Sequence, residues 1–308
     1  MSLPRRALLG TAGVTALLAA AAPPSLARPR HRRPGSGSGS PLAANAIRQI
    51  PLQGAVNVRD LGGYLTYDGA RVRTGRVYRG DHLGRLTDAD VAAIGALGLT
   101  RVVDFRIPLE VQYDGADRLP AGVAGVARSV TDNGLFGQLL TAIGSRDPVR
   151  QEEMLGDGRA AAFMTEVYRT FVTNAANRQR FGATLRELAA PGQGPQLFHC
   201  TSGKDRTGWA SWLVLTLVGV PERSATDDYL ASNAFRAAYD ARVREGLRQG
   251  GLMQDPDLII PLQEVRREYL DAALAEVRTG YGGLYRYVTD GLGLDLRTLA
   301  GLRERLVV

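Results

Sequence analysis

From about residue 47 onward, the hydrophobic and polar positions of the chain change repeatedly between the period of a strand and the period of a helix. Short β-branched or alternating runs predict strands at 77–79, 100–106, 125–130 and 195–200. Apolar residues at helical spacing predict helices at 86–98, in pieces of 134–190, at 206–220 and through most of 224–306. Strands that alternate with helices are typical of a parallel sheet covered by helices, so we predict an α/β fold.

Two local signals define the first elements more closely. Asp68-Gly69 is a strong turn dipeptide and predicts a hairpin over 64–80 that leads into the first predicted strand. Thr87 with Asp90 three residues later has the pattern of a helix N-terminus.

The segment between residues 134 and 190 is predicted to contain at least three helices, with breaks near Gly144, at 156–158 and at 174–177. The part from Leu135 to Phe181 fits two arrangements equally well, a mobile lid over a site or a plain helical layer.

The N-terminus has the pattern of a targeting segment. In residues 1–27 a pair of arginines, Arg5-Arg6, precedes an apolar stretch and a small-residue cleavage site, so we predict an export signal. The pair resembles a twin-arginine signal, although Pro4 stands where Ser or Thr is usual. The alternative is an uncleaved N-terminal anchor, but the apolar stretch is too short to span a bilayer comfortably. Residues 28–46 are basic and Pro-rich, then Gly/Ser-rich, and so predict a flexible tether. We therefore expect an exported protein, either secreted or held in the cell envelope.

The formal charge of +7 is concentrated at the start of the chain. Residues 1–33 hold six arginines and no acidic residue, so about +1 remains for the rest. A nucleic-acid-binding protein carries a basic face on its folded part, and no such pattern is present, so we expect no nucleic-acid partner. Residues 28–33 provide at most a weak attraction to an anionic membrane surface.

The stretch HCTSGKDRTG at 199–208 contains the only cysteine and the only lysine of the chain. One cysteine cannot form an internal disulfide, so the thiol is free, paired with another chain or used chemically. A loop between a strand and a helix directs backbone N–H groups and the positive helix end toward one point, which suits a tetrahedral oxyanion. Gly203 permits the tight path, and the planar guanidinium of Arg206 suits two phosphate oxygens. The predicted phosphate-binding residues are Thr201, Ser202, Gly203, Lys204 and Arg206.

The same surroundings favour the ionised form of Cys200, so we expect a thiolate beneath the bound phosphate. In-line attack by the sulfur on phosphorus gives a phosphocysteine, which water then hydrolyses. The Thr207 hydroxyl is placed to donate a hydrogen bond to the sulfur and ease its departure. His199 is expected to orient the loop, because a nucleophile that is already ionised needs no base.

This loop resembles the signature of cysteine-based protein tyrosine phosphatases, and its Lys-Asp-Arg core is similar to a bacterial branch of secreted tyrosine and dual-specificity phosphatases that also act on phosphoinositides. Further segments resemble that branch in the same order: NVRDLGGY (57–64), VYRGDHL (77–83), VVDFRIPLE (102–110), MTEVYRTFV (164–172) and DDYLASN (227–233). The resemblance implies one catalytic domain over 47–308 with a central, mainly parallel sheet flanked by helices, a helical insertion and a helical C-terminal part. It also implies a phosphotyrosine protein or a phosphoinositide as substrate.

The leaving group needs a proton, and the Trp-Pro-Asp loop of many tyrosine phosphatases is missing, because both tryptophans lie in the helix after the signature loop. The resemblance makes Asp205 the candidate general acid, since its position guarantees nearness to substrate. Asp104 is the second candidate, and its structural alternative is to pair with Arg106 or Arg59. Arg59 and Asp60 either form a structural turn or support the phosphate-binding loop from the side away from the substrate.

Other functions fit less well. A nucleotide-binding Walker loop would require a glycine at position 198 and Ser or Thr at 205, and a metal hydrolase would have only three histidines to use. We therefore expect no metal and no cofactor. We also expect the protein to be a monomer. The rival from another class is a module that binds phosphorylated ligands without turnover. Lys204 either binds a second phosphate or steers anions from the rim.

Overall fold

A computed structural model describes residues 47–308. The predicted export signal (1–27) and tether (28–46) lie outside the described residues. None of the helices within residues 47–308 has the length and apolar character that a bilayer span requires.

Six strands form one sheet in the order β1-β2-β3-β6-β4-β5. The strands are β1 (Arg48–Gln49), β2 (Arg59–Asp60), β3 (Val77–Gly80), β4 (Arg101–Asp104), β5 (Ala124–Ala127) and β6 (Gln196–His199). The strands β3, β6, β4 and β5 are mutually parallel, whereas β1 pairs antiparallel with β2 and β2 with β3 at one edge. The predicted α/β fold with a mainly parallel sheet is therefore confirmed.

Helices make up most of the remaining described chain. They are α2 (Asp88–Gly95), α3 (Pro108–Asp114), α4 (Leu135–Ser145), α5 (Pro148–Leu155), α6 (Arg159–Thr173), α7 (Ala175–Ala189), α8 (Arg206–Leu217), α9 (Glu222–Gln249), α10 (Ile260–Gln263), α11 (Arg267–Tyr281), α12 (Leu284–Arg286) and α13 (Leu296–Leu306). A 3-10 turn, η3 (Pro256–Ile259), and a π-helical turn, η4 (Tyr287–Gly291), complete the set.

Side chains alternate between the two faces of the sheet, as the period of a strand requires. Val102 of β4 and Leu197 of β6 belong to the smaller apolar cluster, which also contains Ile94 of α2. The next residues along these strands, Val103 and Phe198, belong to the larger cluster, to which the long helices contribute. Both faces are thus buried, which explains why these parallel strands are continuous apolar runs.

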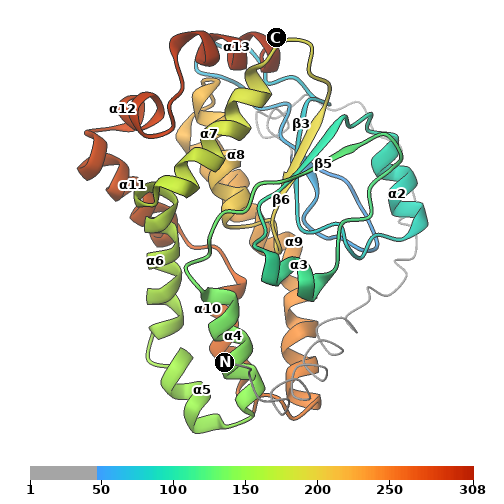
Figure 1. Ribbon diagram of the computed structural model, residues 1–308, viewed down its shortest axis with the longest axis vertical. Coiled ribbons are helices and arrows are strands. Elements are labelled where there is room, and N and C mark those ends of the chain that lie inside the picture. Colours follow the sequence, from blue (N-terminus) through green and yellow to red (C-terminus); the bar gives the residue numbers. More distant parts are fainter. Residues whose placement is uncertain (1–46) are drawn as a thin grey trace, which may run out of the picture.

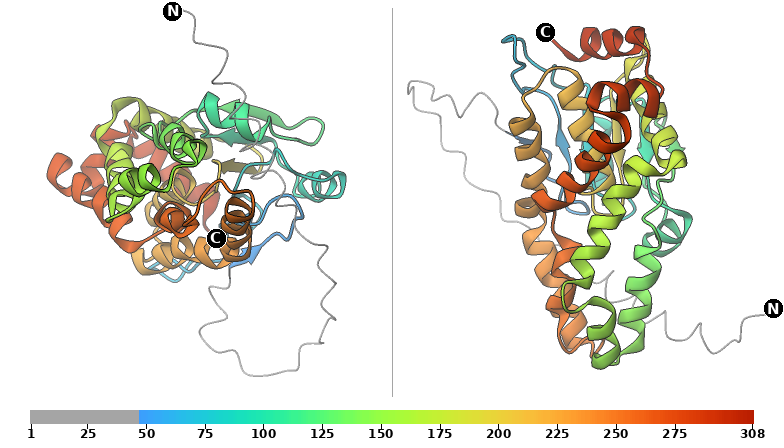
Figure 2. Two further views of the ribbon diagram at one scale, coloured as in Figure 1. Left: turned by 90° about the horizontal axis from the view of Figure 1, so that it is seen from below. Right: turned by 90° about the vertical axis from the view of Figure 1, so that its left-hand side faces the viewer.

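The helices divide into a layer beside the sheet and an extension beyond it. Figure 1 shows α6, α7 and α11 on the side of the sheet opposite α2. It also shows α4, α5, α10 and the end of α9 below the sheet, on the side where the loop after β6 lies. The side view in Figure 2 shows the same projection, so the molecule is elongated in that direction. The carboxyl ends of the parallel strands, where sites form in such folds, therefore face this helical extension.

Candidate active site

The loop of the HCTSGKDRTG stretch connects β6 directly to α8. Cys200 follows the strand and is 1% exposed, and Asp205 is the residue before the first turn of α8. Gly203 has a φ of +65°, and a Cβ there would lie 2.3 Å from the carbonyl oxygen of Gly80 at the end of β3. Only glycine fits both this backbone conformation and this close approach. The predicted tight path at Gly203 is therefore formed against the neighbouring parallel strand.

A buried carboxylate holds Arg206 in place. The Arg206 guanidinium donates two hydrogen bonds to Glu110, 2.6 Å to Oε2 and 2.5 Å to Oε1. The Thr201 hydroxyl donates to the same Glu110 Oε1 at 2.6 Å. Burial disfavours both charges, but the ion pair outweighs it: the pKa of Arg206 is raised well above its usual value and the pKa of Glu110 is lowered. Arg206 is therefore a permanent cation, and the Cys200 sulfur lies within its electrostatic range.

A second buried network supports the loop from the strand side. Arg79 of β3 donates to the carbonyl oxygen of Gly203 at 2.8 Å, and the Asn57 amide donates to the carbonyl oxygens of Ser202 and Gly203 at 3.1 Å each. Asp228 of α9 accepts from Arg79 at 2.6 Å and from Arg59 at 2.9 Å. These contacts occupy the carbonyl oxygens of Ser202 and Gly203 and hold the loop against β3.

The two predicted roles of Arg59 and Asp60 separate in the structure. Arg59 supports the loop through Asp228, which binds it together with Arg79. Asp60 accepts hydrogen bonds from the backbone N–H groups of Gly62 and Gly75, both at 2.7 Å, and so organises a turn.

His199 lies in a cluster of two acids and one arginine. Its Nε2 lies 2.8 Å from Asp117 Oδ2, and its Nδ1 lies 3.8 Å from Asp104 Oδ1. Burial disfavours the imidazolium, but Asp117 outweighs it, so the pKa of His199 is raised. The imidazole is thus fixed beside the loop, in keeping with the predicted orienting role.

The same cluster decides what Asp104 contacts. The Arg106 Nε donates to both Asp104 carboxylate oxygens at 3.0 Å, and its Nη2 lies 2.9 Å from Asp117 Oδ1. Ligand atoms of Asp104, Asp117 and His199 lie within 4.8 Å of one another, a spacing compatible with a metal ion. The Arg106 guanidinium binds both carboxylates and His199 binds Asp117, so this group is a salt-bridge cluster. Asp104 takes the structural role that its alternative predicted, with Arg106 as partner.

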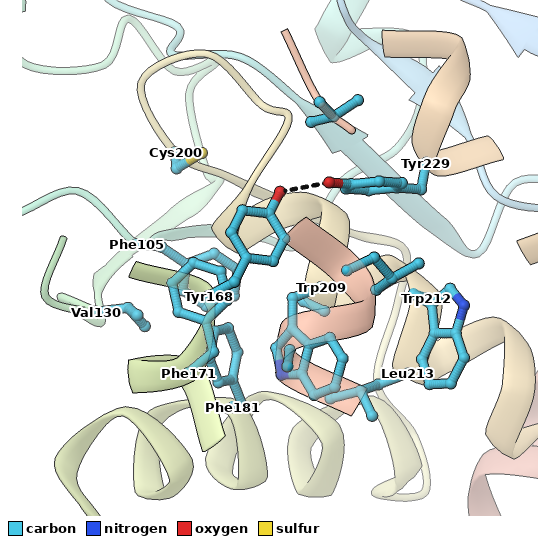
Figure 3. Packing of buried hydrophobic residues seen from close by; sticks show 14 of the residues in the cluster. Phe105, Val130, Tyr168, Phe171, Phe181, Cys200, Trp209, Trp212, Leu213 and Tyr229 are labelled. Atoms are coloured by element: carbon cyan, nitrogen blue, oxygen red, sulfur yellow. Dashed lines mark hydrogen bonds between the residues drawn. The ribbon is translucent and has the colours of Figure 1, made fainter. Parts of the chain in front are cut away.

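Asp205 is surrounded by hydrogen-bond donors. Lys204 Nζ donates to Asp205 Oδ1 at 2.9 Å and to Oδ2 at 2.7 Å. The Tyr168 hydroxyl of α6 donates to Asp205 Oδ1 at 2.9 Å, and the Tyr229 hydroxyl of α9 donates to that of Tyr168 at 2.8 Å. Figure 3 shows the two tyrosine hydroxyls pointing at each other beside the loop that carries Cys200. Lys204 is only 2% exposed, so its ammonium lies against the neighbouring carboxylate and not at an exposed rim, and its part in phosphate binding stays a prediction.

The predicted hydrogen bond from Thr207 to the sulfur is not present. The Thr207 hydroxyl is buried and has no hydrogen-bond partner in the part of the chain that the structure describes. Thr207 stands in the first turn of α8, where its side chain is fully enclosed. A buried hydroxyl without a partner costs about 1–3 kcal/mol, so the position is one that stability alone does not favour.

A cavity of about 410 Å³ opens beside the loop. The loop contributes a polar wall to it: Thr201, Ser202, Lys204, Asp205 and Arg206. The helical extension contributes apolar residues to the lining: Leu135, Phe136, Leu139 and Ile143 of α4, with Val243, Ile259 and Leu262. A ligand with a charged end and an apolar body matches this division. The helix α4 lines the cavity, as both a mobile lid and a plain helical layer over 135–181 would require. Whether this segment is a lid or a layer stays a prediction.

A further cation on the cavity wall was absent from the prediction. Arg236 of α9 is 6% exposed and donates to the carbonyl oxygen of Ser202 at 3.3 Å. It also pairs with Asp240 at 2.6 Å. Arg236 thus connects the long helix α9 to the signature loop.

Comparisons with known proteins give matches over most of the described residues. Residues 50–308 match the model of the tyrosine phosphatase family. A protein of Cupriavidus necator named as a tyrosine-protein phosphatase is 35% identical over 80% of this chain and 84% of its own. The triple specificity protein phosphatase PtpB of Mycobacterium tuberculosis is 32% identical over 85% of this chain and 99% of its own. The crystal structure of TpbA of P. aeruginosa is a distant match, with a TM-score of 0.29 and 17% identity over 68% of this chain and 98% of that chain.

Proposed function

The chain belongs to the tyrosine phosphatase family, and we propose that Cys200 is the nucleophile with which it hydrolyses phosphomonoesters through a phosphocysteine intermediate. The observation that carries this proposal is the arrangement around the signature loop. Its only cysteine follows a buried strand, an arginine clamped by Glu110 opens the next helix, and the loop carbonyls are occupied by Arg79 and Asn57. The remaining loop N–H groups and Arg206 supply the donors that three phosphate oxygens need.

In the first step, the thiolate attacks phosphorus while the bond to the leaving oxygen breaks. Arg206 and the loop N–H groups balance the charge of the equatorial oxygens in the transition state. Asp205 donates its proton to the leaving oxygen. In the second step, Asp205 accepts a proton from the attacking water, and the sulfur departs as thiolate.

Thr207 is proposed to assist that departure by a small rotation of its hydroxyl toward the sulfur. The unpartnered state of the hydroxyl supports this role, because a donor without an acceptor costs free energy until one is supplied. Thr201, Ser202 and Gly203 contribute backbone N–H groups to the phosphate site.

For the substrate, we propose a phosphotyrosine protein, with dual-specificity activity or phosphoinositide hydrolysis in addition. The triple specificity in the name of PtpB supports a range wider than phosphotyrosine. The amphipathic cavity is compatible with an aromatic ring or a lipid near the phosphate. A panel of phosphotyrosine peptide, phosphoserine peptide and phosphoinositides decides among these by their kcat/KM values.

We further propose that the protein is exported, by the twin-arginine route, and acts as a monomer of the secreted branch. The arginine pair and apolar stretch of residues 1–27 support export. Fusion of residues 1–46 to a reporter that is active only after export tests this proposal, with Arg5-Arg6 changed to Lys-Lys as the control.

The decisive test of the reaction is turnover of p-nitrophenyl phosphate in EDTA. The wild-type protein is expected to be active and insensitive to EDTA, and Cys200→Ser is expected to be inactive. Absence of wild-type turnover would favour a module that binds phosphorylated ligands only, and inhibition by EDTA would favour a metal-dependent mechanism.

A further inference from the structure

The carboxylate of Asp205 has two partners of different mobility, and this difference points to a device that acts within the proposed reaction. One partner is Tyr168, whose ring is fixed in the core. The other is Lys204, whose ammonium ends a flexible chain of four methylene groups. The device rests on the proposed function of the loop as an anion site.

Tyr168 keeps Asp205 in place. It is fully buried, and its hydroxyl donates to Asp205 Oδ1 at 2.9 Å. Tyr229, also fully buried, donates to Tyr168 at 2.8 Å and lies 3.2 Å from the carbonyl oxygen of Arg266. Burial first, and the negative charge of Asp205 next, raise the pKa of both tyrosines well above the usual value. Both hydroxyls therefore keep their protons at any pH at which the protein functions.

Lys204 opposes the role proposed for Asp205. Its Nζ contacts both Asp205 oxygens, at 2.9 and 2.7 Å, and its other acceptor is the Glu264 carbonyl oxygen at 3.3 Å. An ammonium that contacts a carboxylate favours the ionised form of that carboxylate. A general acid must instead hold a proton when the substrate arrives. With Lys204 in this position, the ammonium contacts both oxygens of the carboxyl group that would have to carry the proton.

A bound phosphate changes the balance, because Lys204, Asp205 and Arg206 line the same cavity wall. A phosphate dianion competes with Asp205 for the ammonium, and it carries more charge than a carboxylate. The same dianion repels the carboxylate. Both effects favour uptake of one proton by Asp205.

We propose that Lys204 is a substrate-operated switch: the bound oxyanion draws its ammonium away from Asp205, which takes one proton from solvent while Tyr168 holds the carboxyl group in position. The enzyme thereby makes its general acid only when a tetrahedral anion occupies the loop. When phosphate leaves, Lys204 returns to Asp205 and the proton is released.

The charged and titratable groups around Asp205 limit the interpretation of a proton measurement. Tyr168 of α6, Tyr229 of α9 and Tyr269 of α11 face it, and burial raises the pKa of Tyr269 to about 12. Other acids of the same cavity wall are Asp81, Glu110, Asp114, Asp132 and Asp240. Burial raises the pKa of Asp114 to about 6, and Asp117 raises the pKa of the nearby His199 against its burial, so both groups compete for a proton near neutral pH. Substitution of Asp205 itself separates these sources.

The first arm of the test follows the ammonium. Because the chain has one lysine, labelling with ¹³C,¹⁵N-lysine gives the side-chain NMR signal of Lys204 alone. Sulfate serves as the probe, and Cys200→Ser removes the thiol from the proton balance. Saturating sulfate is expected to move the Lys204 signal, and Asp205→Asn is expected to move it already in the free protein. An unmoved Lys204 signal while the loop amide signals respond to sulfate would overturn the switch.

The second arm counts protons by calorimetry of sulfate binding in buffers of different ionisation enthalpy, from pH 5 to 8. Cys200→Ser is expected to take up close to one proton per sulfate at some pH in this range. The double variant with Asp205→Asn is expected to lose that uptake. The matched carboxylate control, Asp104→Asn in the Cys200→Ser background, is expected to keep it, because Arg106 binds both Asp104 oxygens and Asp104 is not among the residues that line the cavity.

Proton uptake that persists without Asp205 would assign the proton to another acid and overturn the proposal. Failure of sulfate to bind would contradict the proposed anion site of the loop, and it would therefore contradict the switch as well. Loss of turnover in the wild type with normal sulfate-linked proton uptake would instead contradict only the proposed function.

Discussion

At the scale of the residue, the contacts of two aspartates distinguish the proposed proton donor from a structural acid. Asp205 lies on the cavity wall with Tyr168 and Lys204 as donors, whereas Asp104 is bound on both oxygens by Arg106. A proton donor must reach the leaving oxygen, and of these two aspartates only Asp205 belongs to the residues that line the cavity.

This difference predicts the outcome of a paired substitution. Asp205→Asn is expected to lower kcat by about 10²- to 10⁴-fold with phenyl phosphate, because a poor leaving group depends on general acid catalysis. The loss is expected to be smaller with p-nitrophenyl phosphate, whose leaving group is stable as an anion. Steady-state rates for both esters measure this. Asp104→Asn is expected to show no such dependence on the leaving group, and a reversed result would transfer the role to Asp104.

At the scale of the element, the signature loop depends on its contact with the end of β3. Gly203 and Gly98 have nearly the same φ, +65° and +66°, but different surroundings. A Cβ at Gly203 would lie 2.3 Å from the Gly80 carbonyl oxygen, whereas a Cβ at Gly98 would meet nothing within 4 Å. The two glycines therefore separate the effect of backbone conformation from the effect of packing.

Gly203→Ala is expected to lower kcat/KM by at least about 10²-fold, because the loop must move relative to β3 and a displacement of about 1 Å at a reacting group has that effect. Gly98→Ala is expected to cost about 1–2 kcal/mol of stability for the left-handed backbone and to leave kcat/KM unchanged. Enzyme kinetics together with thermal unfolding of both variants provide the comparison. Equal losses of activity in both would show that the loop is not held by this contact.

The elements themselves show what a single sequence can predict. The strand at 77–79 and the helix after Thr87 have the predicted places, the latter with the full Thr87–Asp90 capping box. The strands β1 and β2 were missed because two residues are too few to show alternation. The helix α3 was also missed, although Pro108 in its first turn is a typical start signal.

The partners within the site were harder to predict than its central loop. The motif itself located the loop, because its residue types and spacing are specific. Glu110, Asp117 and Asp228 were missed, since each meets its arginine or histidine only after the chain has folded. Arg59 and Asp228, for example, are 169 positions apart. Nothing in local spacing indicates such a pair.

At the scale of the whole molecule, buried carboxylates link stability to acid pH. Burial alone would raise the pKa of Asp228, but Arg59 and Arg79 lower it to about 2, and His199 with Arg106 lowers the pKa of Asp117 to about 2 against its burial. The pKa of an aspartate in an unfolded chain is about 3.9. The stability from these groups is therefore complete above about pH 4 and is lost as the pH falls toward about 2.

Asp228→Asn tests this contribution. It is expected to cost about 3–5 kcal/mol at pH 7, because two buried guanidinium groups lose their partner. It is also expected to reduce the decline in the free energy of unfolding between pH 5 and pH 2.5, measured by urea denaturation. Asp88→Asn is the control, since the Asp88–Arg118 pair is exposed and is worth at most about 1 kcal/mol. An unchanged acid decline in Asp228→Asn would contradict the assignment.

The central claim is that Cys200 becomes covalently phosphorylated in each turnover. Acid quenching of the enzyme during turnover of p-nitrophenyl phosphate, followed by peptide mass spectrometry, measures this directly. The account predicts one phosphoryl group on the peptide that contains Cys200, in larger amount in Asp205→Asn, where hydrolysis of the intermediate is slowed. Turnover without any phosphoryl group on Cys200, or turnover that persists in Cys200→Ser, would contradict it.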